Sequence, residues 1–136
     1  RADMSGRVHL VGHLADSASL IAGSDLVAIT SGRDDRGMGL ESFSLVALEA
    51  MALGTPVVAF AAGGVPEVVG ECARLVPPGD VAALAQAIAD GLKDDDWRAD
   101  AEACGKQRVV EGFTVDRMVD AMRETYLSAI TRRARS

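Results

Sequence analysis

The sequence predicts an α/β protein with a Rossmann-like, doubly wound parallel sheet and flanking helices. Short apolar runs alternate with longer segments of helical periodicity, and turn or cap residues separate them. Residues 56–60 read PVVAF, and a continuous apolar run of this length is typical of a parallel strand covered on both faces. Strands that alternate with helices favour a parallel, doubly wound sheet.

The first part of the chain predicts two strands and one helix. Residues 8–11 have the pattern of a short strand, and residues 26–30 that of a second one. Between them, residues 17–22 form a short helix of small residues, with Asp16 as its N-cap. Residues 32–40, GRDDRGMGL, are polar and rich in glycine, and we expect a mobile loop.

A helix and a strand follow this loop. The oxygens of Ser42 and Ser44 can accept hydrogen bonds from the free N–H groups of a first helical turn. Gly54 stands where the end of that helix needs a left-handed residue. The apolar residues between them have helical spacing: Leu45, Val46, Leu48, Met51, Ala52 and Leu53.

The last part predicts one more strand and several helices. Residues 66–69 form a short helical turn, residues 73–76 the final strand, and residues 77–80, PPGD, a turn and cap. The next helix carries an apolar stripe of Val81, Leu84, Ala85 and Ile88. Residues 94–96 cap a helix over 97–110. Thr114 caps the final helix, whose stripe is Val115, Met118, Val119, Met122, Tyr126 and Ile130.

Composition limits the class of protein. A chain of 136 residues forms one domain at most, and with 49% apolar but 4% aromatic residues its core is built of Ala, Val and Leu. The net charge of −6, with Arg132, Arg133 and Arg135 as a solvated, frayed basic end, argues against a nucleic-acid surface. We expect a cytoplasmic protein, and peripheral association with the inner face of the membrane stays open.

No residue pattern indicates a metal site. Cys72 and Cys104 are the only cysteines, without the spacing of zinc ligands. We expect both to be reduced, buried thiols of a cytosolic protein. The acidic run 94–96 precedes a helix and is interpreted as a cap rather than as a magnesium site.

Two loops of the predicted sheet indicate a ligand site. Residues 31–44 and 61–65 both leave carboxyl ends of strands, where ligands bind in doubly wound sheets. The backbone N–H groups of Ser42–Leu45 lie at a helix N-terminus, which attracts anions such as phosphate. Gly63 and Gly64 allow close approach of the backbone to a ligand, or form a plain turn.

The same segment resembles the donor-binding core of retaining glycosyltransferases with the GT-B fold. This large group 1, or family 4-like, family includes sucrose synthase and many bacterial polysaccharide and glycolipid enzymes. Its pattern E-G-F-G-x-x-x-x-E-A-M-A-x-G-x-P-V-V, followed by G-G-x-x-E, is similar to residues 41–58 and 63–67 here. The residues that carry the match include Glu41, Phe43, Glu49, Gly54, Pro56, Gly63, Gly64 and Glu67. Ser42 and Ser44 replace two glycines of the pattern.

The resemblance implies transfer of a hexose from a nucleoside diphosphate sugar to a hydroxyl acceptor, with retention and without a metal or cofactor. It implies that Glu49 accepts hydrogen bonds from the ribose hydroxyls and that Glu41, the candidate catalytic residue, faces the transferred sugar. It implies donor-binding roles for Ser42, Phe43, Ser44, Leu45, Gly63 and Gly64. Without the flanking pattern, both glutamates would be ordinary exposed residues.

The resemblance also implies that residues 1–136 are a partial C-terminal nucleotide-sugar-binding domain, inactive by itself. The acceptor domain and the first βα units, whose strands would separate segments 8–11 and 26–30, are then absent. We therefore expect the isolated chain to pair its free strand edge, through non-native closure, a dimer or strand exchange.

Two other functions stay open: a non-catalytic interaction module, and a nucleotide-sugar epimerase of the same architecture. The sugar, base and acceptor are not determined by these residues.

Overall fold

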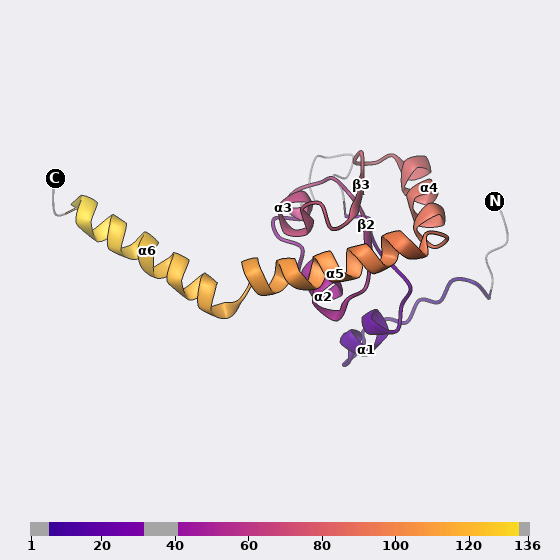
Figure 1. Ribbon diagram of the computed structural model, residues 1–136, viewed down its shortest axis with the longest axis horizontal. Helices are drawn as coiled ribbons and strands as arrows, with labels where there is room; N and C mark the ends of the chain where they lie inside the picture. Colours follow the sequence, from indigo (N-terminus) through magenta and orange to yellow (C-terminus); the bar gives the residue numbers. More distant parts are fainter. Residues whose placement is uncertain (1–5, 32–40, 134–136) are drawn as a thin grey trace.

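A computed structural model describes residues 6–31 and 41–133 (Figure 1). Its sheet has three parallel strands in the order β1 (Val27–Ile29), β2 (Val57–Phe60) and β3 (Arg74–Val76). This arrangement, with helices between the strands, confirms the predicted α/β class. The predicted loop 32–40 lies outside the described residues.

The core has two layers because alternate residues of β2 point to opposite faces of the sheet. Val57 and Ala59 pack with helices α2 (Leu45–Leu53) and α3 (Val65–Val69). Val58 and Phe60 pack with α4 (Val81–Gly91). All four residues of β2 are buried, as the continuous apolar run predicts for a strand covered on both faces.

Helix α2 begins and ends as its cap residues predict. The hydroxyl of Ser44 accepts a hydrogen bond from the N–H of Ala47 at 3.3 Å. Gly54 closes the helix in the left-handed conformation, with a φ of 82°. These local interactions fix where α2 starts, and therefore which residues stand at its N-terminus.

Helix α5 (Asp95–Gly112) lies close against α2, with its Gly105 next to Met51 and its Lys106 next to Gly54. Ala47 and Ala50 on α2 are fully buried. A Cβ added to Gly105 would lie 3.2 Å from side-chain atoms of Met51. A side chain at this position would therefore require Met51 or the helix to shift by a few tenths of an ångström.

The start of α5 is held by Asp94. Its carboxylate accepts from the N–H of Trp97 at 3.0 Å and from the Arg74 guanidinium at 2.6 Å. The Trp97 N–H, and after it the guanidinium, lower the pKa of this carboxyl below its ordinary value. Asp94 is therefore the helix cap and links α5 to β3, whereas Asp95 and Asp96, predicted to belong to the cap, stand in the first turn of the helix.

The predicted strand at residues 8–11 is wrong. These residues are exposed and irregular, although α1 (Ser17–Ala22) follows with its predicted Asp16 cap. A strand exists only through pairing, and within the described ranges no strand pairs with this segment or with the outer side of β1. Pairing of the free β1 edge in solution stays a prediction.

The predicted apolar stripe of α4 is only partly a core face, and that of α6 packs into no core among the described residues. In α4, Leu84 is buried and Ile88 is half-buried, but Val81 is 71% exposed and Ala85 is also exposed. The reason is that the side of α4 that packs on β2 is centred on Leu84, Ala87 and Ile88.

Helix α6 (Val115–Arg133) begins at the predicted cap, Thr114. It projects away from the rest of the chain (Figure 1) and has no buried residue. No helix among the described residues is long and apolar enough to span a membrane.

The expectation of two reduced thiols is also wrong. Cys72 and Cys104 form a disulfide, with 5.4 Å between their Cα atoms. They are 32 residues apart in the sequence, so no local pattern brings them together. The packing of α5 beside α2 and α3 does so.

Candidate functional site

The candidate site lies where the segment before α2 meets the loop after β2. The N–H of Gly64 donates to the carbonyl oxygen of Glu41 at 2.7 Å. The structure thus brings the described end of the first predicted loop, residues 41–44, against the second one, residues 61–65. Helix α2 starts three to four residues after Glu41. The first N–H groups of a helix have no backbone partners.

Gly63 and Gly64 are required for this contact. A Cβ at Gly63 would lie 2.0 Å from the carbonyl oxygen of Glu41, and one at Gly64 would lie 2.2 Å from that of Ser42. Gly63 also has a φ of +56°, which favours glycine. The missing side chains therefore allow the turn to press against the backbone of Glu41 and Ser42.

The four residues at the start of α2 differ in their surroundings. Ser44 is fully buried and its hydroxyl is engaged as the helix cap. Ser42 and Leu45 are exposed. Phe43 is 43% exposed, and its ring centre lies 5.9 Å from that of Phe113. Ser42 and Leu45, rather than the buried Ser44 hydroxyl, are therefore the residues of this segment that are open to solvent.

The two candidate glutamates also differ. Glu41 is half-buried, and its Oε2 atom is buried without a hydrogen-bond partner among the described residues. An unsatisfied buried acceptor costs about 1–3 kcal/mol or more, so a donor at this point would stabilise the site. Glu49 is exposed, one helical turn after Leu45 on α2. The structure therefore brings Glu41 into the contact with Gly64 and leaves Glu49 open to solvent.

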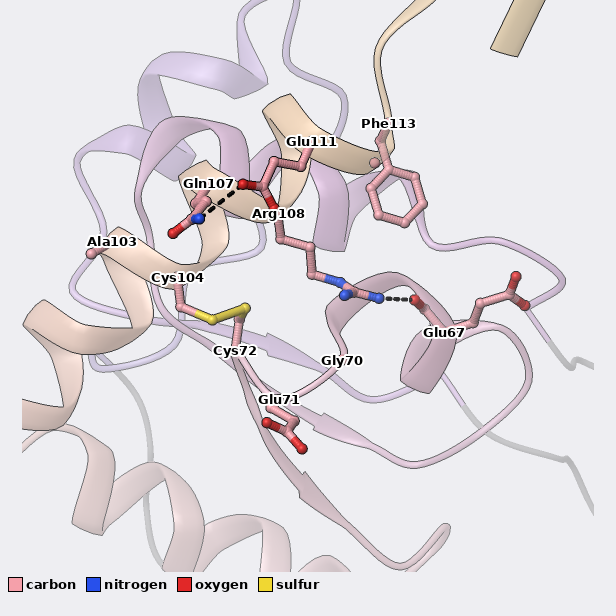
Figure 2. A pocket seen from close by; sticks show the side chains of 11 residues that line it. Glu67, Gly70, Glu71, Cys72, Ala103, Cys104, Gln107, Arg108, Glu111 and Phe113 are labelled. Carbon is pink, nitrogen blue, oxygen red and sulfur yellow. Dashed lines mark hydrogen bonds between the residues drawn. A yellow bond between two sulfur atoms is a disulfide. The ribbon is translucent and has the colours of Figure 1, made fainter. Parts of the chain in front are cut away.

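Sequence reasoning missed Arg108. Its Nε donates to the carbonyl oxygen of Val68 at 2.7 Å. Its Nη2 donates to the carbonyl oxygen of Glu67, also at 2.7 Å (Figure 2). These carbonyls end α3, where helical carbonyls lack backbone partners. The sequence shows that the last carbonyl groups of α3 need hydrogen-bond donors. It does not show that the donor is Arg108, which lies 40 positions after Val68.

Among the grooves lined by described residues, two lie near this site. The larger, about 910 Å³, is lined among others by Glu67, Cys72, Cys104, Arg108 and Phe113 (Figure 2). None of the sequence-predicted donor-binding residues lines it. A smaller, mainly apolar groove of about 420 Å³ includes Phe43, Leu45 and Phe113. Across residues 6–31 and 41–133, no group of three or more His, Cys, Asp or Glu side chains is placed to hold a metal ion.

Comparisons with known proteins agree on one family. The model of the family described as glycosyl transferases group 1 matches residues 1–94. The chain is 38% identical over 134 residues to MMP alpha-(1->4)-mannosyltransferase of Mycolicibacterium hassiacum, covering 95% of this chain and 31% of that protein. It is 32% identical over 126 residues to N-acetyl-alpha-D-glucosaminyl L-malate synthase of Bacillus anthracis, covering 91% of this chain and 31% of that protein.

Solved structures give the same result. HepE of Anabaena in complex with UDP-glucose is similar with a TM-score of 0.76 and 31% identity, over 91% of this chain and 33% of that chain. The chain spans about a third of the length of these relatives.

Proposed function

The chain belongs to the glycosyl transferases group 1 family, and on this basis we propose that it forms part of the nucleotide-sugar-binding domain of a retaining glycosyltransferase. The observation that carries the proposal is the Gly64–Glu41 contact. It brings the turn after β2 against the segment that leads into α2, at a glutamate whose Oε2 has no hydrogen-bond partner among the described residues. The UDP-glucose complex of HepE, a structural relative, supports a donor of this chemical class.

The full-length protein would transfer a hexose from a nucleoside diphosphate sugar to a hydroxyl acceptor. The diphosphate gains negative charge as the glycosidic bond breaks. The N–H groups at the start of α2, with a helix dipole equivalent to roughly half a positive charge, would stabilise it. Stabilisation that grows with the developing charge accelerates the reaction, and one such donor is worth about 10²–10³ in rate.

The two glutamates would hold the two sugars of the donor. The exposed carboxylate of Glu49 can accept hydrogen bonds from both hydroxyls of the ribose, because each of its oxygens has free lone pairs. Glu41 would face the transferred hexose, and a hydroxyl of that sugar would donate to its carboxylate. The acceptor would bind mainly to another part of the full-length protein, so we propose that this chain alone does not turn over substrate.

Donor binding by the full-length protein tests this function. We expect calorimetry to detect binding of a UDP- or GDP-hexose, and Glu49→Gln to weaken it at least tenfold, since a hydrogen bond to a charged group contributes about 1.5–3 kcal/mol. Glu124→Gln, at an exposed position of α6, is the matched control and should change nothing.

Each rival function has its own outcome in this experiment. No binding of any nucleotide sugar would contradict the proposal and favour an interaction module. Conversion of the donor sugar without an acceptor would favour an epimerase.

We also propose that the reaction is metal-independent. Glycosyl transfer by the full-length protein should continue in excess EDTA, because the helix N-terminus takes the role that a divalent cation has with a bound diphosphate. Product formation is measured with and without the chelator. Complete loss of activity, with recovery on addition of magnesium or manganese, would contradict this expectation.

A further inference from the structure

We propose that Arg108, outside the sequence motif of the site, is a positioning residue for donor binding. This inference rests on the proposed function and deepens it. Arg108 lies on α5 and contacts neither Glu41 nor Glu49 in any interaction described above. It acts through α3, whose first residues follow the turn that presses against Glu41.

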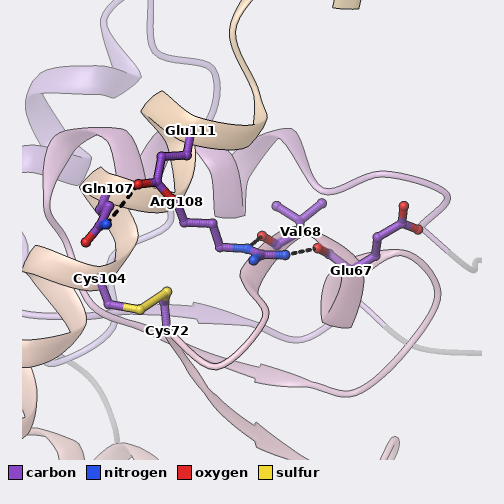
Figure 3. The surroundings of a disulfide bond; sticks show 7 residues. All are labelled: Glu67, Val68, Cys72, Cys104, Gln107, Arg108 and Glu111. Carbon is purple, nitrogen blue, oxygen red and sulfur yellow. Dashed lines mark hydrogen bonds between the residues drawn. A yellow bond between two sulfur atoms is a disulfide. The ribbon is translucent and has the colours of Figure 1, made fainter. Parts of the chain in front are cut away.

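The first step is the attachment of Arg108 to the end of α3. Its guanidinium binds the carbonyl oxygens of Val68 and Glu67, as Figure 3 shows. Gly70 makes room for it, since a Cβ at that position would lie 2.7 Å from the guanidinium carbon. Arg108 is half-buried, so this planar group is held by two directed hydrogen bonds rather than by charge alone.

The disulfide is a second attachment of the same segment. Cys104 precedes Arg108 by one helical turn and therefore lies on the same side of α5. Its partner, Cys72, follows α3. Figure 3 shows both contacts side by side, between α5 and the segment from Glu67 to Cys72. Together they fix the C-terminal end of α3 relative to α5.

The other end of α3 reaches the candidate site. The helix has five residues, and Gly64, its N-cap, donates to Glu41. Val65, Val68 and Val69 are fully buried, so α3 cannot shift at one end without repacking the core. A change in the position of its C-terminal end therefore moves the turn at Gly63 and Gly64.

A second path leads from Arg108 to the same place. The guanidinium carbon lies 5.7 Å from the centre of the Phe113 ring. The Phe113 ring lies 5.9 Å from that of Phe43, which stands between Ser42 and Ser44 before α2. Arg108 thus supports both segments that form the site, the turn after β2 and the residues before α2.

The same helix offers a matched control. Arg98 of α5 donates to the carbonyl oxygen of Gly91 at 3.0 Å, and Gly91 is the last residue of α4. Arg98 therefore supports the end of a helix, as Arg108 does. The helix that it supports, α4, covers the other face of the sheet, where its Leu84 packs in one cluster with Val58, Phe60 and Ala62.

The experiment compares Arg108→Gln and Arg98→Gln in the full-length protein. Both substitutions should lower the melting temperature by similar amounts. Arg108→Gln should raise the donor KM about tenfold with a smaller change in kcat, within the ~10²-fold that a 1 Å misplacement can cost. Arg98→Gln should leave the donor KM unchanged. Arg108→Lys, which keeps one charged donor, should recover part of the loss.

An unchanged donor KM in Arg108→Gln, in a protein whose native form binds the donor, would overturn the positioning role and leave the proposed function intact. Equal rises in donor KM for Arg108→Gln and Arg98→Gln would also overturn it, because general destabilisation would then explain both. A native protein that binds no nucleotide sugar would instead overturn the proposed function, and the positioning role with it.

Discussion

Gly64→Ala should reduce donor kcat/KM of the full-length protein by about 100-fold, the loss expected for a displacement near 1 Å in a catalytic site. The new Cβ would lie 2.2 Å from the backbone carbonyl oxygen of Ser42. A backbone atom cannot rotate away as a flexible side chain can, so the turn and the segment before α2 must separate. The hydrogen bond from Gly64 to Glu41 would be lost, and Oε2 of Glu41 would move away from the donor.

Gly112→Ala is the matched control for this substitution. Gly112 ends α5, and a Cβ there meets nothing within 4 Å. Its donor kinetics should equal those of the native protein. Steady-state kinetics with varied donor, together with thermal unfolding, separate a misplaced site from an unfolded protein. Native kinetics in a folded Gly64→Ala protein would contradict the assignment of this contact to the donor site.

Replacing both cysteines by alanine should lower the free energy of unfolding by roughly 3–4 kcal/mol on the chain-entropy estimate for a loop of this length. The disulfide joins residues 32 positions apart. Alanine is preferred to serine because Cys72 is buried in the core, and an unpaired hydroxyl there would add its own cost. We expect the melting temperature to fall by roughly 10 °C.

The native protein with added reductant provides the comparison. It should melt close to the double variant, and the variant itself should not respond to reductant. Alkylation of the unfolded native protein without reductant should label neither cysteine. Two labelled thiols would contradict the disulfide. Disulfides are rare in the cytosol. Alkylation of the protein as it is isolated from cells therefore also tests the expected cytoplasmic location.

The parts of the fold that were predicted correctly depend on local interactions. Ser44 begins α2 and Gly54 ends it, each through contacts within one or two helical turns. The continuous apolar run at β2 directly indicates a strand that is buried on both faces. The family pattern that begins at Glu41 includes Gly63 and Gly64, so the sequence alone indicates this turn. Roles of these residues in donor binding stay predictions, although their closeness to Glu41 is confirmed.

The parts that could not be predicted depend on distant segments. Arg108 and Val68 are 40 residues apart, and Cys72 and Cys104 are 32 apart, so only the packed position of α5 reveals either pair. Segment 8–11 has the composition of a strand but no described partner, and composition cannot supply one. The spacing of apolar residues along 115–130 correctly predicts a helix, but it does not show what packs against those residues.

The close approach of α5 to α2 limits how the sequence can change over evolution. At Gly105, a larger residue would meet Met51, and the simplest accommodation is an outward shift of α5. Cys104 and Arg108 are on that helix and would move with it. A larger residue at Gly105 would then change the affinity for the donor, although Gly105 is buried and does not touch the donor site. We therefore expect Gly105 to tolerate fewer substitutions than other residues without a chemical role.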